Sequence, residues 1–237
     1  MDRRTFLGSA LATSVLVLAP APLARALCAG GDSVIELRGA ITPTRPAAAG
    51  LVLVRQDGPS PVAVADVSAV RMIGRGQTPF SFAVEELTPD VLALRPTAPL
   101  QPGRYELRGI SSGPMPVELV DAPIAAPPPP AVVALRRSRS TEGRGPRSVT
   151  SSALTLELRD GAPTGAIAIA EWTQEGETAR TWGEISATAP RPTAILASVG
   201  RCSGHGRFPP EGVGVTVRVL DLYAQLSAPS RVLRAPR

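Results

Sequence analysis

Short runs of apolar residues recur about every ten positions along the chain, and clusters of proline and glycine separate them. Within several runs apolar and polar residues alternate, as they do around Phe80, Phe82 and Val84, and again around Tyr105 and Leu107. Such alternation places every second side chain on one face, which is typical of a half-buried β-strand. No segment keeps a helical period. The pattern therefore predicts an all-β protein with the rhythm of a β-sandwich.

A proline run at Pro127 to Pro130 divides these strands into two groups, because proline donates no ladder hydrogen bond and favours an extended spacer. We expect two immunoglobulin-like β-sandwich domains after an N-terminal signal peptide. The predicted boundaries are 1–26 for the signal peptide, 27–122 for the first domain, 123–131 for the linker and 132–237 for the second domain. Strands are expected near 33–39, 50–54, 61–67, 69–73, 80–84, 90–95, 103–109, 115–120, 131–137, 152–158, 165–172, 179–185, 193–199, 214–226 and 229–234.

The first 26 residues have the features of an export signal. Arg3 and Arg4 precede a short apolar stretch, and the sequence Ala-Arg-Ala at 24–26 fits a cleavage site. Residues 3–7 resemble a twin-arginine signal, although Asp2 and Gly8 depart from its pattern; an ordinary secretory signal is the alternative. The apolar stretch is too short to span a bilayer, so no transmembrane segment is expected in the mature chain. We expect a periplasmic or secreted protein.

The sequence LQPGRYEL at 100–107 resembles the turn that leads into strand F of fibronectin type III and related immunoglobulin-like domains. This resemblance implies that Tyr105 is the tyrosine-corner residue, whose hydroxyl bonds backbone upstream. The segment from Phe208 to Ser230 is similar to strands F and G of the same fold, although Val213 or Val215 stands where the tyrosine would be. The fold hosts many functions, so the resemblance indicates architecture and no chemistry.

Two cysteines and one histidine are the residues with the most distinctive chemistry. In an exported protein, Cys28 and Cys202 are expected to form a disulfide. Lipidation of Cys28 is the alternative, with anchoring to an envelope membrane through acyl chains as its consequence, although Leu27 and Arg25 do not fit a lipobox. Cys202 and His205 lie in one glycine-rich loop, which by itself orients no nucleophile. Ligands are too few for a metal centre, and no cofactor is expected.

Charge is concentrated in one segment of an otherwise balanced chain. The formal net charge is +5, and aromatic residues make up 3% of the sequence, so neither charge nor stacking residues indicate a nucleic-acid partner. The segment 135–148 is arginine-rich. It is interpreted as a solvated loop between the first two strands of the second domain or as an anion-binding loop. The arginines concerned are Arg136, Arg137, Arg139, Arg144 and Arg147.

Two further motifs match catalytic patterns in residue type but not in the structure expected around them. GISSG at 109–113 matches a nucleophile elbow, but Pro114 and Pro116 exclude the helix that must follow, so a hairpin turn is expected. In EWTQEGE, Trp172 is expected in the core, and its neighbouring glutamates are expected in a solvated hairpin rather than as a glycosidase pair.

The sequence thus favours a non-catalytic binding or structural module of the cell envelope or of a secreted protein. An envelope protein or a glycan is the expected partner, and the oligomeric state is left open. The alternative is an enzyme or enzyme-accessory protein whose site the sequence does not reveal.

Overall fold

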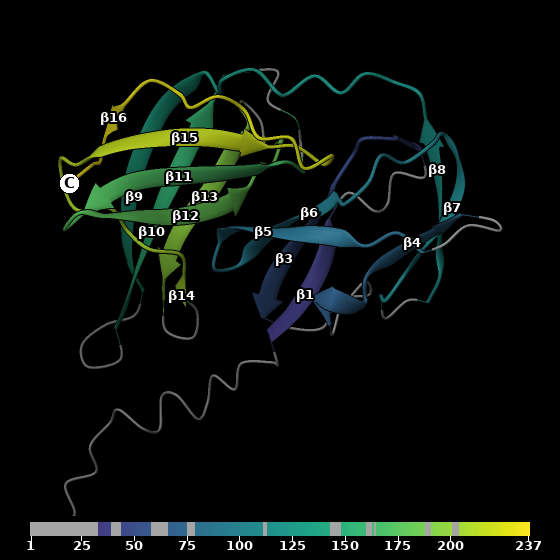
Figure 1. Cartoon of the computed structure of the whole chain (residues 1–237). Coiled ribbons are helices and arrows are strands. Elements are labelled where there is room, and N and C mark those ends of the chain that lie inside the picture. Colours follow the sequence, from purple (N-terminus) through teal and green to yellow (C-terminus); the bar gives the residue numbers. More distant parts are fainter. Residues whose placement is uncertain are drawn as a thin grey trace, which may run out of the picture.

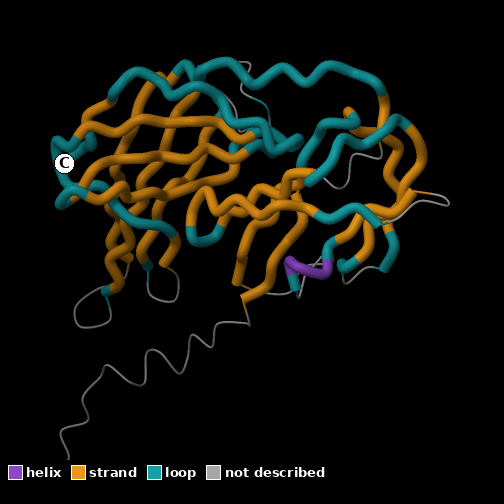
Figure 2. Tube along the Cα trace, in the orientation of Figure 1, coloured by secondary structure: helices purple, strands orange, loops and turns teal. Residues whose placement is uncertain are grey.

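The structure is a computed structural model of the whole chain. It describes residues 33–38, 44–57, 66–74, 79–110, 113–142, 148–159, 163, 165–187, 191–200 and 204–237. These residues form strands and loops, together with one 3-10 turn, η1 (Val67–Ala69), and no α-helix (Figure 2). The all-β prediction is confirmed. Over this part of the chain there is no helix with the length and hydropathy needed to cross a membrane.

The strands before residue 121 form two four-stranded sheets. One has the order β1-β3-β6-β5 and the other has the order β2-β8-β7-β4, in which β2 and β8 run parallel. The remaining pairs of named strands in these two sheets are antiparallel. The strands are β1 (Ser33–Arg38), β2 (Thr44–Pro46), β3 (Leu51–Asp57), β4 (Arg71–Gly74), β5 (Phe82–Thr88), β6 (Val91–Pro96), β7 (Gly103–Arg108) and β8 (Met115–Val120).

The strands after residue 131 form two more sheets, with the orders β14-β13-β10-β9 and β12-β11-β15-β16. All their described pairs are antiparallel. We call residues 33–120 the first half and residues 132–237 the second half. The strands are β9 (Val132–Glu142), β10 (Val149–Leu158), β11 (Ile167–Gln174), β12 (Glu177–Glu184), β13 (Thr193–Val199), β14 (Gly204–His205), β15 (Gly214–Leu220) and β16 (Leu233–Arg234).

Each half has an apolar core between its two sheets. In the first half the core includes Leu53, Leu94 and Leu107, which come from both sheets. In the second half Val215, Val217 and Val219 of β15 are buried, and Trp172 packs in the same cluster, as predicted. Because one face of each strand turns inward, the period-two pattern of the sequence matches the observed layers.

The two halves lie side by side rather than end to end. The segment 121–131, drawn in teal, leaves β8 and crosses the top of the view to reach β9 (Figure 1). It contains no strand. This crossing brings sheet β1-β3-β6-β5 of the first half against sheet β12-β11-β15-β16 of the second, and an apolar cluster joins them.

The arginine-rich segment differs from its interpretation as a loop. Strand β9 continues through it to Glu142 and pairs with β10 over the whole of that length. Arg136, Arg137 and Arg139 are therefore strand residues, while Arg144 and Arg147 lie outside the described residues. Backbone pairing with β10 extends the strand beyond the apolar run, which is a tertiary effect that side-chain composition does not encode.

Candidate functional site

The contact between the two halves is built from the outer faces of two sheets. Strands β3 and β6 of the first half meet strands β11, β12 and β15 of the second half. The strands concerned are apolar on both faces, so burial of one face in a core leaves a second face to cover. The contacting side chains are Val52, Val54, Leu87, Val91, Ala93, Ile167, Ile169, Trp182, Leu220 and Ala224, with Leu226 against them.

A bulge in β5 shapes one border of this contact. The register between β5 and β6 shifts between Glu86 and Thr88, which leaves Leu87 without a partner on β6. The Leu87 side chain is buried in the apolar cluster between the halves, and its carbonyl oxygen accepts a hydrogen bond of 3.1 Å from Arg180 Nη1. Bulges commonly re-aim the backbone in this way. The bulge therefore turns an edge strand into a contact with the second half.

Further arginines form polar contacts across the same junction. Arg95 Nη1 donates to the carbonyl oxygen of Ala224 at 2.9 Å. Arg38 Nη1 lies 3.1 Å from a carboxylate oxygen of Glu184. Each of these bonds joins a residue of the first half to one of the second, so the position of one half relative to the other is set by directional bonds as well as by apolar burial.

The loop between β15 and β16 fits closely against the first half. The Gly50 N–H donates to the carbonyl oxygen of Tyr223 at 3.0 Å. A Cβ at Gly50 would stand 2.6 Å from the Leu94 carbonyl oxygen and 2.8 Å from the Ala224 Cβ, so only glycine fits there without displacement. This approach also seats the guanidinium of Arg45, which donates through Nη2 to the Leu222 carbonyl oxygen.

Arg45 is the largest of the fully buried side chains, with 1% of its surface exposed. Its Cζ lies 5.5 Å from the centroid of the Tyr223 ring, while its Nε and Nη1 have no hydrogen-bond partner among the described residues. Burial lowers the pKa of Arg45 to about 10, against the favourable charges of Tyr223 and Asp221. Burial also raises the pKa of Asp221, against the two backbone N–H bonds that its carboxylate accepts. Arg45 therefore remains a charged group at neutral pH inside the junction of the two halves.

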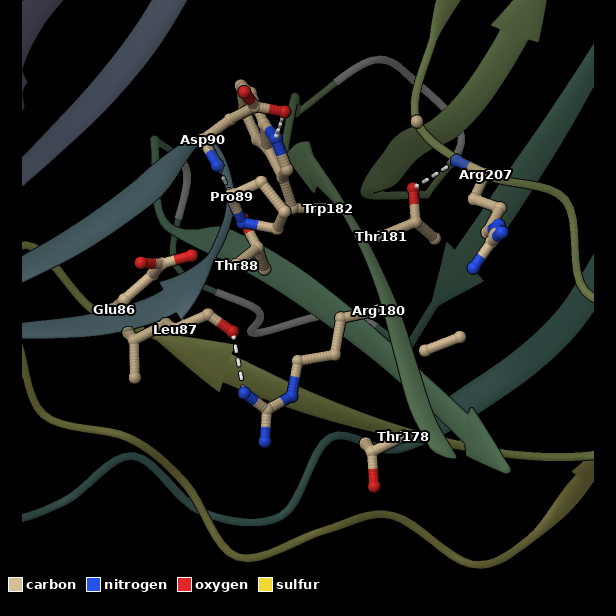
Figure 3. Close-up of a pocket in the computed structure, with 12 residues that line it drawn as sticks. Glu86, Leu87, Thr88, Pro89, Asp90, Thr178, Arg180, Thr181, Trp182 and Arg207 are labelled. Carbon is tan, nitrogen blue, oxygen red and sulfur yellow. Dashed lines mark hydrogen bonds between the residues drawn. The ribbon is translucent and has the colours of Figure 1, made fainter. Parts of the chain in front are cut away.

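A cleft of about 510 Å³ opens beside this contact (Figure 3). One wall is the end of β5 and the turn that follows it; the other is β12, with the residues after β14. Figure 3 shows Arg180 reaching across to Leu87 and Arg207 on the side opposite Glu86. The lining residues are Glu86, Leu87, Thr88, Pro89, Asp90, Thr178, Ala179, Arg180, Thr181, Trp182, Gly206 and Arg207.

The charged groups of the cleft fall into two classes. Arg180 is held by Glu171, with Nε 2.9 Å from the carboxylate, and Asp90 accepts a long hydrogen bond of 3.5 Å from Trp182 Nε1. Among the described residues nothing forms an ion pair with Glu86 or Arg207. Those two side chains stand on opposite walls. Within the described residues the cleft therefore presents one cation outside any ion pair, Arg207, and two such carboxylates, Glu86 and Asp90, of which Asp90 is hydrogen-bonded to Trp182.

The same contact borders a second, smaller cleft of about 360 Å³. It shares Glu86, Leu87, Thr178 and Arg180 with the first cleft, so the two meet at the Arg180 side chain. More of the charged side chains that line the second cleft form ion pairs. Glu171 contacts Arg180 at 2.9 Å and lies 3.5 Å from Arg218, and Glu85 contacts Arg95 at 2.8 Å. The first cleft is consequently the better candidate for a ligand.

The single histidine supports the wall of the first cleft. His205 Nε2 lies 2.7 Å from the Trp182 carbonyl oxygen and therefore donates its proton there, and the two rings meet edge to face with centroids 4.7 Å apart. Beside it, the backbone N–H of Arg207 donates to the Thr181 hydroxyl. Both contacts lie within the second half. They fix the positions of Trp182 and Arg207 relative to one another.

The structure distributes the arginines of the predicted anion-binding loop. Arg136 Nε contacts Glu157 at 2.8 Å, and Arg137 Cζ lies 4.8 Å above the ring of Phe208. Arg139 lies further along β9, and the other two arginines are not among the described residues. An ion pair and a cation–π contact therefore occupy two of the five side chains.

The remaining predicted residues lie in two places. The hydroxyl of Tyr105 donates to the Gln101 carbonyl oxygen at 2.8 Å, four residues upstream, at the start of β7. Cys28 and Cys202 lie outside the described residues, so the disulfide stays a prediction. Among the residues that the structure does describe, no group of three or more His, Cys, Asp or Glu side chains gathers in a way that could hold a metal ion.

No protein-family model matches the chain, and no curated protein matches it either. Reasoning from the sequence did not find Glu86, Asp90, Trp182 or Arg207. The sequence could have indicated Trp182, because it lies in an alternating strand and because a second large aromatic residue is consistent with a second apolar surface. The other three come together only through the contact between the halves.

Proposed function

We propose that this chain is an exported, non-catalytic binding module whose ligand occupies the first cleft. The observation that carries the proposal is a cleft whose two walls belong to different halves, fixed by an apolar cluster and by arginine-to-backbone bonds. Preformed walls reduce the ordering that a ligand must impose on binding. Glu86 and Arg207 supply polar groups for orientation. The one histidine is engaged with a backbone carbonyl, which favours binding over acid-base chemistry.

We propose further that the two halves are immunoglobulin-like domains of the fibronectin type III kind, with a linker at 123–131. Three features support this: the sheets divide between residues 120 and 132, β2 pairs in parallel with the last strand of its half, and the Tyr105 hydroxyl bonds backbone upstream. The finer assignment rests on these features together with the resemblance at 100–107.

Export to the periplasm or outside the cell, by the twin-arginine route, is part of the same proposal. It is supported by Arg3, Arg4 and the cleavage pattern at 24–26. Replacing the pair Arg3 and Arg4 by lysine is expected to leave the precursor uncleaved inside the cell, as followed by immunoblotting of cell fractions. Normal export of that variant would contradict the twin-arginine route and favour the ordinary secretory one.

The side-by-side arrangement supports the proposed disulfide between Cys28 and Cys202. The start of β1 and the short strand β14, which are the described elements nearest the two cysteines, both lie toward the lower side of Figure 1. Cys28 lies five positions before Ser33, a length of chain that spans at most about 17 Å when extended. A disulfide needs its two Cα atoms about 4 to 7 Å apart.

Native mass spectrometry of protein taken from its own envelope fraction tests the export and disulfide parts. We expect a chain that starts at Leu27 and gains the mass of two hydrogens on reduction. An acyl mass on Cys28 would contradict a free mature protein, and unchanged mass on reduction would contradict the disulfide. A retained metal or small molecule would contradict the absence of a cofactor.

Binding at the cleft is testable by fluorescence, because Trp182 lines it and Trp172 is buried in a core. In a Trp172→Phe variant Trp182 is the only tryptophan. We expect saturable emission changes with a ligand that binds there, weakened at least tenfold by Arg207→Glu. Arg104→Glu is the matched control, because Arg104 is exposed on β7 in the other sheet of the first half. Equal weakening by both variants would contradict a site in the cleft.

A further inference from the structure

The geometry of one hairpin decides which backbone groups line the cleft. Strands β11 and β12 are joined by Glu175 and Gly176, with φ of 54° and 86°. Two consecutive residues with positive φ define the tight two-residue turn of a β-hairpin. The residues that flank such a turn, Gln174 and Glu177, form a pair that exchanges both backbone hydrogen bonds.

This closing pair determines which backbone N–H and C=O groups of β12 point to β11 and which point away from it. Hydrogen-bonded pairs occur at every second position in an antiparallel ladder. Ala179, Thr181 and Gly183 therefore bond β11, while the N–H and C=O groups of Thr178, Arg180 and Trp182 point to the opposite edge of the strand. The Trp182 carbonyl confirms the direction, because it accepts from His205, which lies outside the β11 ladder.

Only part of this edge is covered. The Trp182 carbonyl is bonded by His205 at one end of this edge. At the other end, Thr178 and Arg180 line the first cleft. Within the described part of the chain, no residue hydrogen-bonds the outward N–H or C=O groups of those two residues. The cleft therefore contains a short length of open strand edge.

We propose that the ligand of the cleft is an extended polypeptide segment of a partner protein, which adds to β12 as a further strand at Thr178 and Arg180. This rests on the function proposed above. An open edge offers N–H donors and C=O acceptors at the spacing of a polypeptide backbone, and strand addition uses them as its main source of affinity. A glycan has no group that repeats at this spacing in the same order.

The walls of the cleft specify the side chains of this segment. Successive residues of a strand point to opposite faces. On β12 the Arg180 side chain lies on the face toward the first half, where Glu86 stands, whereas Arg207 is bonded to Thr181, whose side chain lies on the other face. A segment beside β12 therefore places one side chain near Glu86 and the next near Arg207. The complementary pair is a basic residue followed or preceded by an acidic one.

The experiment selects heptapeptides from a random displayed library against the oxidised mature protein carrying Trp172→Phe. The expected peptides contain neighbouring basic and acidic residues, change the Trp182 emission, and protect the amide hydrogens of Thr178 and Arg180 from exchange. Methylating alternate backbone nitrogens of a selected peptide is expected to weaken binding at least tenfold in one of the two alternating sets and little in the other. Equal effects of both sets would overturn strand addition.

A protein variant tests the same point from the other side. Thr178→Pro removes an outward N–H and no bond to β11, whereas the control Thr178→Ala keeps that N–H. We expect at least tenfold weaker binding for the proline variant only. Where the proline variant does not fold, the methylated peptides carry the test. Arg207→Glu is expected to lose the selected peptide and regain it when the acidic residue of the peptide is replaced by lysine.

The outcomes separate this inference from the function on which it rests. Peptidoglycan fragments that change Trp182 emission without protecting the Thr178 and Arg180 amides would overturn strand addition and leave a binding cleft. Peptides that bind without that protection would overturn it in the same way. If neither heptapeptides nor peptidoglycan fragments affect Trp182, both proposals fail.

Discussion

At the scale of single residues, Arg45 is a buried charged side chain with two nitrogen atoms that lack hydrogen-bond partners among the described residues. A guanidinium has five N–H donors, and here the partner found for it is one carbonyl oxygen, at Leu222. Its stem fills space between the two halves, and its charge lies over the Tyr223 ring. The side chain therefore contributes through its volume, while its desolvated charge opposes folding.

Two substitutions at Arg45 separate volume from charge. Arg45→Ala removes both and leaves a cavity, so we expect a loss of about 3 kcal/mol in the free energy of unfolding. Arg45→Met keeps most of the volume and removes the buried charge, so we expect a change within about 1 kcal/mol. Urea denaturation measures both. A loss as large for methionine as for alanine would show that the charge itself stabilises the junction.

At the scale of elements, two irregularities position the candidate site. The bulge at Leu87 turns the end of β5 toward the second half, and the two-residue turn at 175–176 sets which edge of β12 is open. A hairpin was predicted from the sequence for the glutamate-rich segment beside Trp172. The bulge was not, because β5 carries no glycine and its extra residue is fixed by the face that Leu87 buries.

A substitution in this turn is expected to stabilise the protein. Glu175 holds a φ of 54°, which a glutamate adopts at a cost and asparagine adopts readily. We expect Glu175→Asn to raise stability by about 0.5 kcal/mol, which corresponds to about 1 to 2 °C in Tm for a chain of this size. Differential scanning calorimetry of Glu175→Asn and of Glu177→Asn, one residue beyond the turn, measures this. An equal gain for both would contradict a turn-specific cause.

At the scale of the whole molecule, the contact between the halves joins two units that each have their own hydrophobic core. The apolar cluster there includes Ile169 and Trp182, which are 2% and 7% exposed. Burial of side chains of this size contributes about 2 kcal/mol each. The polypeptide between 120 and 132 adds no strand of its own, so the contact rather than the connection fixes the arrangement.

The substitution Ile169→Glu tests this coupling, with Ile195→Glu as its control. A carboxylate at Ile169 would be buried without a partner in the contact, at a cost of several kcal/mol, whereas Ile195 is 55% exposed. We expect the native protein to unfold in one calorimetric transition and Ile169→Glu to unfold in two, with a larger radius of gyration by X-ray scattering. A single transition and unchanged radius in Ile169→Glu would contradict a coupled body.

The sequence by itself determined the fold class, the buried position of Trp172 and the hairpin at 175–176, because each follows from local periodicity or turn chemistry. Glu86 and Arg207 illustrate what it could not determine. They are 121 positions apart in the chain and share a cleft only because two apolar sheet faces meet. Apolar burial has no direction, so the pattern shows that a face must be covered, and only the tertiary structure decides what covers it.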